Sequence, residues 1–312
     1  MVNDCAYVGQ TLIKYLPSKI ETIHIKRSRH SLGKTFGIAW KIFRSKGDIY
    51  HVHYLLQDCY LALKFGKKPI IGHAHGSDIR ETINQKVYGR IVRYNLKNCD
   101  KILVSTPNLL KTARKYNENA EYLPNLIDES MFYPKERKIG DNLKVLIASS
   151  SDWKVKGTDK IILALSKIKS GVETSIIKYG SDSHKTLRLI NSVKLHVNVL
   201  PKVPHSEVSK YYWDSDVVIE AIGVGGTLGM GVLEAIACGR PVITHVSSEF
   251  PEYKDFPLLD VSTPEEIASA ILSSRDENLW KKEYEYFKTY HNSKKVINRL
   301  KEIYIDAMGD KQ

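Results

Sequence analysis

The sequence predicts an α/β protein with two doubly wound domains that face each other across a cleft between the carboxyl ends of their strands, followed by a helical C-terminal tail. Two observations support this fold class. Short β-branched runs alternate with amphipathic helical patterns in both halves of the chain, which is typical of parallel sheets covered by helices on both faces. A chain of 312 residues is also too long for one ordinary core and suits two domains of roughly 150 residues each.

The first half alternates strands and helices up to a proline- and glycine-containing connection. The predicted strands are residues 22–26, 48–54, 69–73, 101–105 and 121–123. The predicted helices are residues 7–16, 34–45, 58–65, 85–97 and 107–116. Residues 132–142 contain proline, glycine and a run of charges, so we place the domain boundary there and expect domains at residues 1–135 and 143–312.

The second half repeats the pattern and ends in helices. Its predicted strands are residues 144–149, 174–179, 196–200, 217–221 and 242–246. Beyond residue 263 the pattern is helical, with helices expected at residues 264–273, 277–290 and 293–308. Such a tail can fold back over the other domain and tie the two together.

The positive charge of the chain is concentrated in its first half. The formal net charge is +12, and residues 1–135 contain 22 basic and 11 acidic side chains. A basic half beside a nearly neutral one indicates a polyanionic partner, either nucleic acid, anionic lipid headgroups or a phosphorylated substrate. The alternative is an ordinary solvated surface rich in lysine.

Several classes of protein are excluded by composition. The balance of 42% apolar and 26% charged residues is that of a folded globular protein, and no stretch approaches the ~20 apolar residues of a membrane span. The N-terminus lacks the layout of a secretory signal. The cysteines Cys5, Cys59, Cys99 and Cys238 lie far apart without a CxxC pair, so we expect neither a zinc site nor a disulfide framework, and a reducing cytoplasm is the default location. We also expect no metal site and no cofactor.

A glycine-rich turn before a short helix is the strongest chemical signal. Gly229 and Gly231 belong to four glycines that precede or open a helix with a buried stripe at Val232, Leu233 and Ile236. Such a turn presents free N–H groups and the positive end of the helix dipole, which suits a phosphate. Glu234, one turn into the helix, suits the hydroxyls of a ribose, although it is also compatible with a solvent-facing helix residue.

Five segments resemble, in the expected order, the family 4 retaining glycosyltransferases. The sequence LEAIACGRPVI at residues 233–243 is similar to the nucleotide-sugar motif of that family. The other matching segments are HAHGSDI (73–79), CDKILVSTP (99–107), LPNLIDESMFYP (123–134) and the pair Lys156–Gly157. The resemblance covers nearly the whole chain and implies the GT-B fold of two Rossmann-like domains, together with retention of the anomeric configuration.

The resemblance and the chemistry of glycosyl transfer assign roles to individual residues. A departing nucleoside diphosphate gains negative charge, so fixed cations and N–H donors must face the phosphates. Lys156, helped by Lys154, and the backbone near Met230 suit this role without a metal. By resemblance, His75 contacts the donor sugar or diphosphate and the backbone near Val203 contacts the nucleobase. His73 is compatible with either a functional or a packing role, and His51 and His53 are expected to be structural.

Three departures from the family pattern affect these assignments. Gly226 stands where the first motif glutamate is expected, so Glu220 is the alternative carboxylate for the sugar. The arginine expected shortly before Lys156 is absent, and Lys154 occupies a similar place. The chain also opens near where the first family strand ends, so we expect either a shortened first strand or a start upstream of Met1.

Aromatic and basic residues alternate in the predicted helix at residues 34–45. Trp40 lies at helical spacing from two phenylalanines, with basic residues around it, as in a helix that lies on an anionic bilayer. The acceptor or membrane side is therefore assigned to Lys34, Trp40, Lys41, Arg44 and Arg80. The alternative is that the aromatics form the core stripe of this helix and the lysines its wet face.

The sequence thus predicts a metal-independent hexosyltransferase in the cytoplasm or peripheral on the inner face of the membrane. It would transfer a hexose from a nucleotide sugar to a sugar or lipid-linked acceptor in glycan biosynthesis. Gly226 motivates an alternative, a non-catalytic GT-B-like subunit that binds a nucleotide sugar or a partner enzyme. A nucleic-acid-binding protein is the least supported reading, because no helix-turn-helix, zinc or RNA-binding signature accompanies the positive charge.

Overall fold

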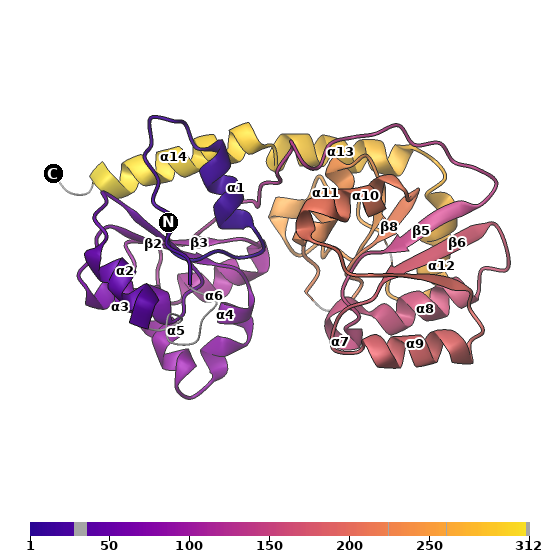
Figure 1. The fold of residues 1–312 in the computed structure, drawn as a ribbon, viewed down its shortest axis with the longest axis horizontal. Coiled ribbons are helices and arrows are strands. Elements are labelled where there is room, and N and C mark those ends of the chain that lie inside the picture. The colour runs from indigo at the N-terminus through magenta and orange to yellow at the C-terminus, as the bar shows by residue number, and fades with distance from the viewer. Residues whose placement is uncertain (28–35, 224, 260, 310–312) are drawn as a thin grey trace. The chain divides into compact units, whose positions relative to one another are not determined.

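A computed structural model of the chain describes residues 1–27, 36–223, 225–259 and 261–309 (Figure 1). The chain forms two compact units. Unit 1 comprises Met1–Leu126 together with His291–Gln312, and unit 2 comprises Ile127–Tyr290. Each unit contains one sheet in which every strand pair is parallel, which confirms the predicted α/β class.

Unit 1 is built on a four-stranded sheet in the order β1-β2-β3-β4. The strands are β1 (Tyr50–His53), β2 (Ile70–Ala74), β3 (Lys101–Val104) and β4 (Glu121–Tyr122). The helices are α1 (Val8–Tyr15), α2 (Ile38–Arg44), α3 (Gln57–Lys64), α4 (Ser77–Arg80), α5 (Tyr88–Asn98), α6 (Leu110–Arg114) and α14 (Ser293–Gly309), with 3₁₀ turns at Thr82–Asn84 and Pro107–Leu109.

The two faces of this sheet differ in polarity. Alternate strand residues such as Val52 and Ile70 join apolar residues of α2, α3 and α5 in one core. On the opposite face, β1 and β2 bury three histidines, His51, His53 and His73, beside Ile71. Helix α14 packs beside α1 (Figure 1), and its Tyr304 hydroxyl lies 2.8 Å from His51 Nδ1.

Unit 2 is built on a five-stranded sheet in the order β7-β6-β5-β8-β9. The strands are β5 (Leu143–Ile147), β6 (Val172–Ile177), β7 (Val197–Leu200), β8 (Val217–Ile219) and β9 (Val242–Ile243). The helices are α7 (Trp153–Lys156), α8 (Thr158–Ser166), α9 (Ser183–Ser192), α10 (Val208–Trp213), α11 (Met230–Ala237), α12 (Pro264–Ser273) and α13 (Asn278–Tyr290), with 3₁₀ turns at His205–Glu207 and Pro251–Tyr253.

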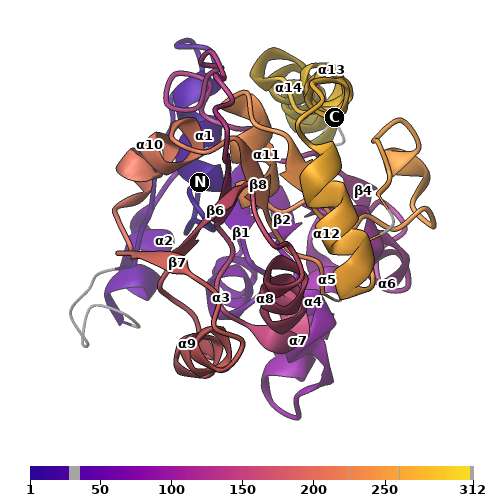
Figure 2. The same ribbon diagram turned by 90° about the vertical axis from the view of Figure 1, so that its right-hand side faces the viewer.

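Apolar cores cover both faces of the second sheet. Along β5, Val145 and Ile147 join one core while Leu146 joins the other, as the alternation of a strand requires. One core includes α8 and α12, which pack side by side with α9 next to α8 (Figure 2). The other includes α10, α11 and α13. Unit 2 is therefore doubly wound, as the sequence predicts.

Several predicted boundaries are wrong in detail. The strand expected at residues 22–26 is reduced to an isolated parallel bridge between Val2 and Ile25, with a second bridge from Val2 to Val52. The helix expected at 85–97 begins only at Tyr88, after a 3₁₀ turn. In unit 2, β5, β6, β8 and β9 end two or three residues earlier than predicted, whereas β7 ends where it was predicted to end. In the described part of the chain, no helix combines the length and apolar character that crossing a bilayer would require.

The units also divide the chain differently from the predicted domains. The division falls between Leu126 and Ile127, and α14 belongs to unit 1 rather than to the second domain. Of the C-terminal tail that was predicted to fold back, α14 thus belongs to unit 1. Its start is held in unit 1 by His291, whose Nδ1 bonds to the carbonyl of Asn125 at 2.7 Å.

A buried arginine joins the end of α10, the turn after α11 and the segment at Lys135. The guanidinium of Arg240 is 1% exposed and donates to the carbonyls of Tyr212, Trp213, Lys135 and Gly239 at 2.7–3.1 Å. Burial lowers the pKa of Arg240, but four carbonyl acceptors compensate the charge.

We expect Arg240→Met to lower the free energy of unfolding by about 3 kcal/mol, because four carbonyls, two of them in fully buried hydrogen bonds, lose a charged donor. Urea unfolding followed by circular dichroism measures the change. The matched control is Arg188→Met, at an exposed arginine of the same unit, which should change stability by less than about 0.5 kcal/mol. Equal effects of the two substitutions would contradict the structural role of Arg240.

Candidate functional site

The carboxyl end of β8 places a buried carboxylate against the first turn of α11. Glu220 follows the strand directly and is 5% exposed. A Cβ on Gly231 would overlap the Glu220 Oε1 atom, so only glycine permits this approach. Burial raises the pKa of Glu220 above its ordinary value, and the nearby Lys156 ammonium opposes that shift.

The backbone of Lys156, the last residue of α7, is fixed next to the segment that follows β8. Its Nζ lies 3.8 Å from Glu220 Oε2, and its side chain is about one quarter exposed. Asp152 caps the short α7 by accepting from the Val155 N–H at 2.8 Å, and Lys156 accepts through its carbonyl from the Ile222 N–H at 3.0 Å. Lys156 is therefore an anchored side chain with a carboxylate partner. Lys154, two residues earlier, is exposed.

Helix α11 begins without a side-chain cap, as the glycine-rich sequence predicts. Its N-cap is Gly229 in an extended conformation, and no described side chain accepts from the N–H groups of its first turn, which begins at Met230. These N–H groups and the helix dipole together attract an anion. Since Gly231 belongs to this turn, the anion-attracting end of α11 adjoins the Glu220–Lys156 pair.

Glu234 is not a solvent-facing residue. It is 5% exposed, its Oε1 lies 2.7 Å from His205 Nε2, and its Oε2 accepts from the Tyr212 hydroxyl at 3.3 Å. His205 opens the 3₁₀ turn that follows Val203, so this bond places the Val203 loop against α11. One oxygen of the carboxylate is thus fixed by an imidazole.

Gly226 occupies a backbone position that disfavours the glutamate of the family pattern. Its φ is +52°, a left-handed conformation that L side chains rarely adopt. A Cβ there would lie 2.7 Å from the Ser247 Cβ, and the Gly226 carbonyl accepts from the Ser247 N–H at 3.0 Å. The loop is therefore built around glycine at this position.

In unit 1, His75 follows the carboxyl end of β2, as predicted. Asp78 is buried and accepts from the N–H groups of Leu55, His75, Gly76 and Ile79 at 2.9–3.2 Å, which fixes the loop. Burial raises the pKa of Asp78, and these four donors oppose the shift. The Arg80 guanidinium covers Gly76, where a Cβ would overlap it. His75 thus lies in the loop between β2 and α4, and Arg80, the last residue of α4, places its guanidinium over that loop.

His75 is the outermost of four neighbouring histidines. Its Nε2 lies 2.8 Å from His53 Nδ1. Burial and the adjacent imidazoles hold the pKa of His51, His53 and His75 well below 6.5, and burial lowers that of His73 to about 3. These imidazoles are therefore neutral at physiological pH.

The aromatic residues of α2 are not its core stripe. Ile38 and Ile42 face the core, whereas Trp40 and Phe43 are 58% and 55% exposed. The Trp40 and Phe43 rings stack at 5.9 Å, and the Arg44 guanidinium lies 5.5 Å from the Trp40 ring. Lys41 is exposed on the same helix, and Lys34 lies outside the described residues. The core-stripe alternative for the aromatics is therefore wrong.

Comparison with known protein families agrees with these two units. Residues 130–291 match the family described as glycosyl transferases group 1, and residues 11–130 match the one described as glycosyltransferase family 4. The chain belongs to the group 1 glycosyl transferases. The family predicted from the sequence is thereby confirmed.

Several known proteins are similar to this glycosyltransferase over most of its length. N-acetyl-alpha-D-glucosaminyl L-malate synthase of Bacillus anthracis is 25% identical, covering 86% of this chain and 77% of its own. Sucrose-phosphate synthase of Thermosynechococcus elongatus has a similar structure, with a TM-score of 0.73, 16% identity, and coverage of 97% and 92%. HepE of Anabaena, solved with UDP-glucose, has a TM-score of 0.70, 14% identity, and coverage of 96% and 89%. These likenesses confirm the GT-B fold class.

The structure brings together only some of the predicted site residues of the glycosyltransferase. Lys156, Glu220 and Gly231 adjoin one another in unit 2, while Trp40, Lys41 and Arg44 lie on α2 of unit 1. Sequence reasoning missed His205 and Tyr212, the partners of Glu234. The histidine in the LPKVPH segment was a visible signal for the first, whereas nothing in the sequence singled out Tyr212.

We expect Lys156→Met to raise the pKa of Glu220 further, because the opposing cation is lost. A carboxyl whose pKa is raised in the folded state lowers stability as pH increases through that pKa. The variant should therefore match the wild type near pH ~4 and become progressively less stable toward pH ~8. Urea unfolding at several pH values measures this.

The control for this pH effect is Lys156→Met combined with Glu220→Gln. Without a titrating carboxyl at position 220, the extra loss of stability with rising pH should disappear. If the pH dependence of Lys156→Met persists in the double variant, Glu220 is not its source.

Proposed function

We propose that this glycosyltransferase transfers a hexose from a nucleoside diphosphate sugar, with retention and without a metal in the reaction. The observation that carries the proposal is the adjacency of three features in unit 2: the Lys156 ammonium, the uncapped start of α11 and the Glu220 carboxylate. They supply cationic and N–H groups for a diphosphate and an acceptor for sugar hydroxyls.

The proposed chemistry follows from where charge develops. As the bond between the anomeric carbon and the phosphate oxygen breaks, its electron pair stays on the diphosphate. Lys156 and the first-turn N–H groups of α11 stabilise that charge from fixed positions, with little rearrangement at the moment of reaction. The Glu220 carboxylate pairs with the Lys156 ammonium, and this ion pair keeps the ammonium close to the site.

Two further parts of unit 2 are proposed to bind the nucleoside. Glu234 accepts from the ribose hydroxyls, with its carboxylate oriented by His205. The backbone at Val203 contacts the base, because the same loop carries His205 and is drawn against α11. Lys154 adds positive charge for the diphosphate, and His75 is the proposed contact for the donor sugar.

The names of similar proteins suggest the class of donor. HepE binds UDP and UDP-glucose, and the Bacillus anthracis relative is named for N-acetylglucosaminyl transfer. We therefore propose a UDP-hexose, in which a neutral sugar is joined to uridine diphosphate. The alternative is a non-catalytic subunit that binds a nucleotide sugar or a partner enzyme without transfer.

The acceptor is proposed to be lipid-linked and reached from an anionic membrane. The support is the exposed aromatic pair Trp40 and Phe43, with Lys41 and Arg44 on the same short helix. Aromatic rings insert at the headgroup boundary, and each basic residue near an anionic surface contributes about 1 kcal/mol. The positive first half of the sequence has the charge for such a partner.

We expect UDP to raise the thermal unfolding midpoint of the chain, while GDP and ADP do so less. A ligand at about 100 times its dissociation constant adds about 2.7 kcal/mol to stability. With UDP-hexose as donor, Lys156→Met should lower turnover by about 100-fold or more, because a charge on the leaving group loses its partner. Lys169→Met, at an exposed lysine of the same unit, is the control.

Glu220 and Gly231 are tested in the same assay. Glu220→Gln should lower turnover far more than it weakens UDP binding, whereas equal effects would reject a role at the sugar. Gly231→Ala should impair both, because its Cβ overlaps Glu220, while Gly140→Ala meets open space and should change neither. UDP binding without donor hydrolysis or transfer to any sugar or lipid acceptor would favour the non-catalytic subunit.

We expect the chain to bind vesicles that contain anionic phospholipid and to bind neutral vesicles weakly. Trp40→Ala or Phe43→Ala should each reduce vesicle binding by roughly tenfold, because a buried aromatic side chain contributes on the order of 1–2 kcal/mol. Tyr88→Ala, at an exposed aromatic of α5, is the control. Vesicle sedimentation measures binding, and stronger salt-sensitive binding to nucleic acid than to vesicles would overturn this assignment.

A further inference from the structure

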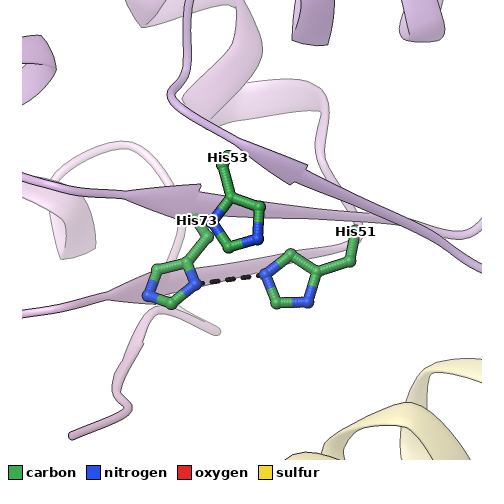
Figure 3. A group of neighbouring side chains, drawn as sticks. All are labelled: His51, His53 and His73. Atoms are coloured by element: carbon green, nitrogen blue, oxygen red, sulfur yellow. Dashed lines mark hydrogen bonds between the residues drawn. The ribbon is translucent and has the colours of Figure 1, made fainter. Parts of the chain in front are cut away.

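Three histidines lie together on the buried face of the sheet of unit 1. His51 and His53 alternate along β1, so their side chains point to the same face, and His73 stands opposite His53 in the register of β1 and β2. Figure 3 shows the three rings next to one another. All three are at most 2% exposed.

Their ring nitrogens are close enough to share an ion. The potential ligand atoms of the three residues lie within 4.8 Å of one another. His51 Nε2 and His73 Nδ1 are 3.1 Å apart (Figure 3). In a tetrahedral zinc site with Zn–N bonds of about 2.0–2.1 Å, neighbouring nitrogens are about 3.4 Å apart. The observed pair already has nearly that separation.

The cluster is not saturated by its own hydrogen bonds. Among the described residues, Nε2 of His53 and Nε2 of His73 have no partner although both are buried. Leaving a buried polar group unsatisfied costs about 1–3 kcal/mol. The face of a sheet in a protein core is normally lined with aliphatic side chains, so three imidazoles here need a compensating interaction.

We propose that His51, His53 and His73 bind one first-row transition metal ion, with Zn²⁺ as the ion of choice. The ligands are Nε2 of His51, Nε2 of His53 and Nδ1 of His73. Of the two atoms without a partner, the ion satisfies Nε2 of His53, whereas Nε2 of His73 lies on the far side of its ring from the ion. Three imidazoles without a carboxylate suit Zn²⁺, Cu²⁺, Ni²⁺ or Co²⁺ rather than Mg²⁺ or Ca²⁺. Binding breaks the hydrogen bond between His51 Nε2 and His73 Nδ1, and its proton moves to the other nitrogen of the same ring, so that both imidazoles stay neutral.

Neighbouring groups hold two of the rings in the required orientation. The Tyr304 hydroxyl lies 2.8 Å from His51 Nδ1, and His75 Nε2 lies 2.8 Å from His53 Nδ1. When these partners accept from the Nδ1–H groups, Nε2 of each ring presents its lone pair to a metal. Tyr304 is thus a positioning residue, and through it the site ties α14 to β1.

An entry path reaches the cluster. A cavity of about 700 Å³ in unit 1 is lined by both His51 and Tyr304, together with residues of the N-terminal segment and of α14. The site lies in a different unit from the Glu220–Lys156 pair, although His53 bonds to His75, the proposed contact for the donor sugar. Its role is to stabilise unit 1.

The test titrates the full, untagged chain, freed of metal, with Co²⁺. We expect one equivalent to bind with the intense visible absorption of a four-coordinate site, and Zn²⁺ to displace it. Zn²⁺ should also raise the thermal unfolding midpoint. His73→Ala and His51→Ala should weaken Co²⁺ binding by more than about 100-fold, beyond the loss typical of outer-shell changes. The matched control His184→Ala, at an exposed histidine, should bind as the wild type does.

Tyr304→Phe distinguishes a metal site from a hydrogen-bonded cluster that only fills the core. It keeps the ring but removes the hydroxyl beside His51, and should weaken Co²⁺ binding by about 10–100-fold. Circular dichroism shows whether each variant is folded, and the wild-type titration decides the question if a histidine variant is not. Absence of stoichiometric Co²⁺ binding by the wild type, or equal binding by a folded His73→Ala, would overturn the proposal.

Discussion

The buried carboxylate of Glu220 is the constraint on which the candidate site of unit 2 depends. A carboxylate at the end of a central strand is costly unless a cation and close dipoles compensate it. Lys156 supplies the cation, and the first turn of α11 supplies the dipole, but only because Gly231 has no side chain to separate them. The approach of the Lys156 loop requires glycine as well, since a Cβ on Gly223 would overlap the Val155 carbonyl. The glycines of this region therefore have a packing role and an electrostatic role at once, and the two cannot be separated by inspecting the motif.

Unit 1 is subject to a different constraint, because polar side chains are buried against one face of its sheet. Its apolar face packs against α2, α3 and α5, while its histidine face is covered by elements from the two ends of the chain, α1 and α14. Gly9 of α1 permits this cover, because a Cβ there would lie 2.9 Å from His53 Nε2. Tyr304 of α14 contributes a hydroxyl that lies 2.8 Å from His51 Nδ1. The return of the chain to unit 1 thus completes a buried polar layer, which explains why the last helix belongs to unit 1 although its sequence follows unit 2.

Local patterns were sufficient to predict most strands and the glycine-rich helix start, because β-branched runs and glycine spacing act over a few residues. The contacts that define the site were not predictable in this way. Glu234 and His205 are 29 residues apart, and their pairing follows from the order of strands in the sheet. The face of α2 was ambiguous for a related reason. Two stripes of apolar residues share helical spacing, and only the position of the sheet decides that Ile42 is buried and Trp40 is exposed. The prediction of a strand at residues 22–26 was wrong because the composition of this segment is typical of a strand, whereas its pairing amounts to a single bridge.

The backbone conformation explains why glycine, and not the glutamate of the family pattern, stands at position 226. A glutamate there would have to adopt a positive φ and displace Ser247, whose N–H is bonded to the Gly226 carbonyl. The loop of this chain is therefore built around glycine at position 226. Glu220, six residues earlier, lies at the end of a strand and needs no strained conformation to reach the start of α11. A carboxylate on a strand end is held more rigidly than one on a glycine loop, because the ladder bond from its N–H to the Ile243 carbonyl fixes its backbone. If Glu220 has taken over the recognition of the donor sugar, the site exchanges an adaptable contact for a fixed one, and it should discriminate more sharply between hexoses that differ at a single hydroxyl.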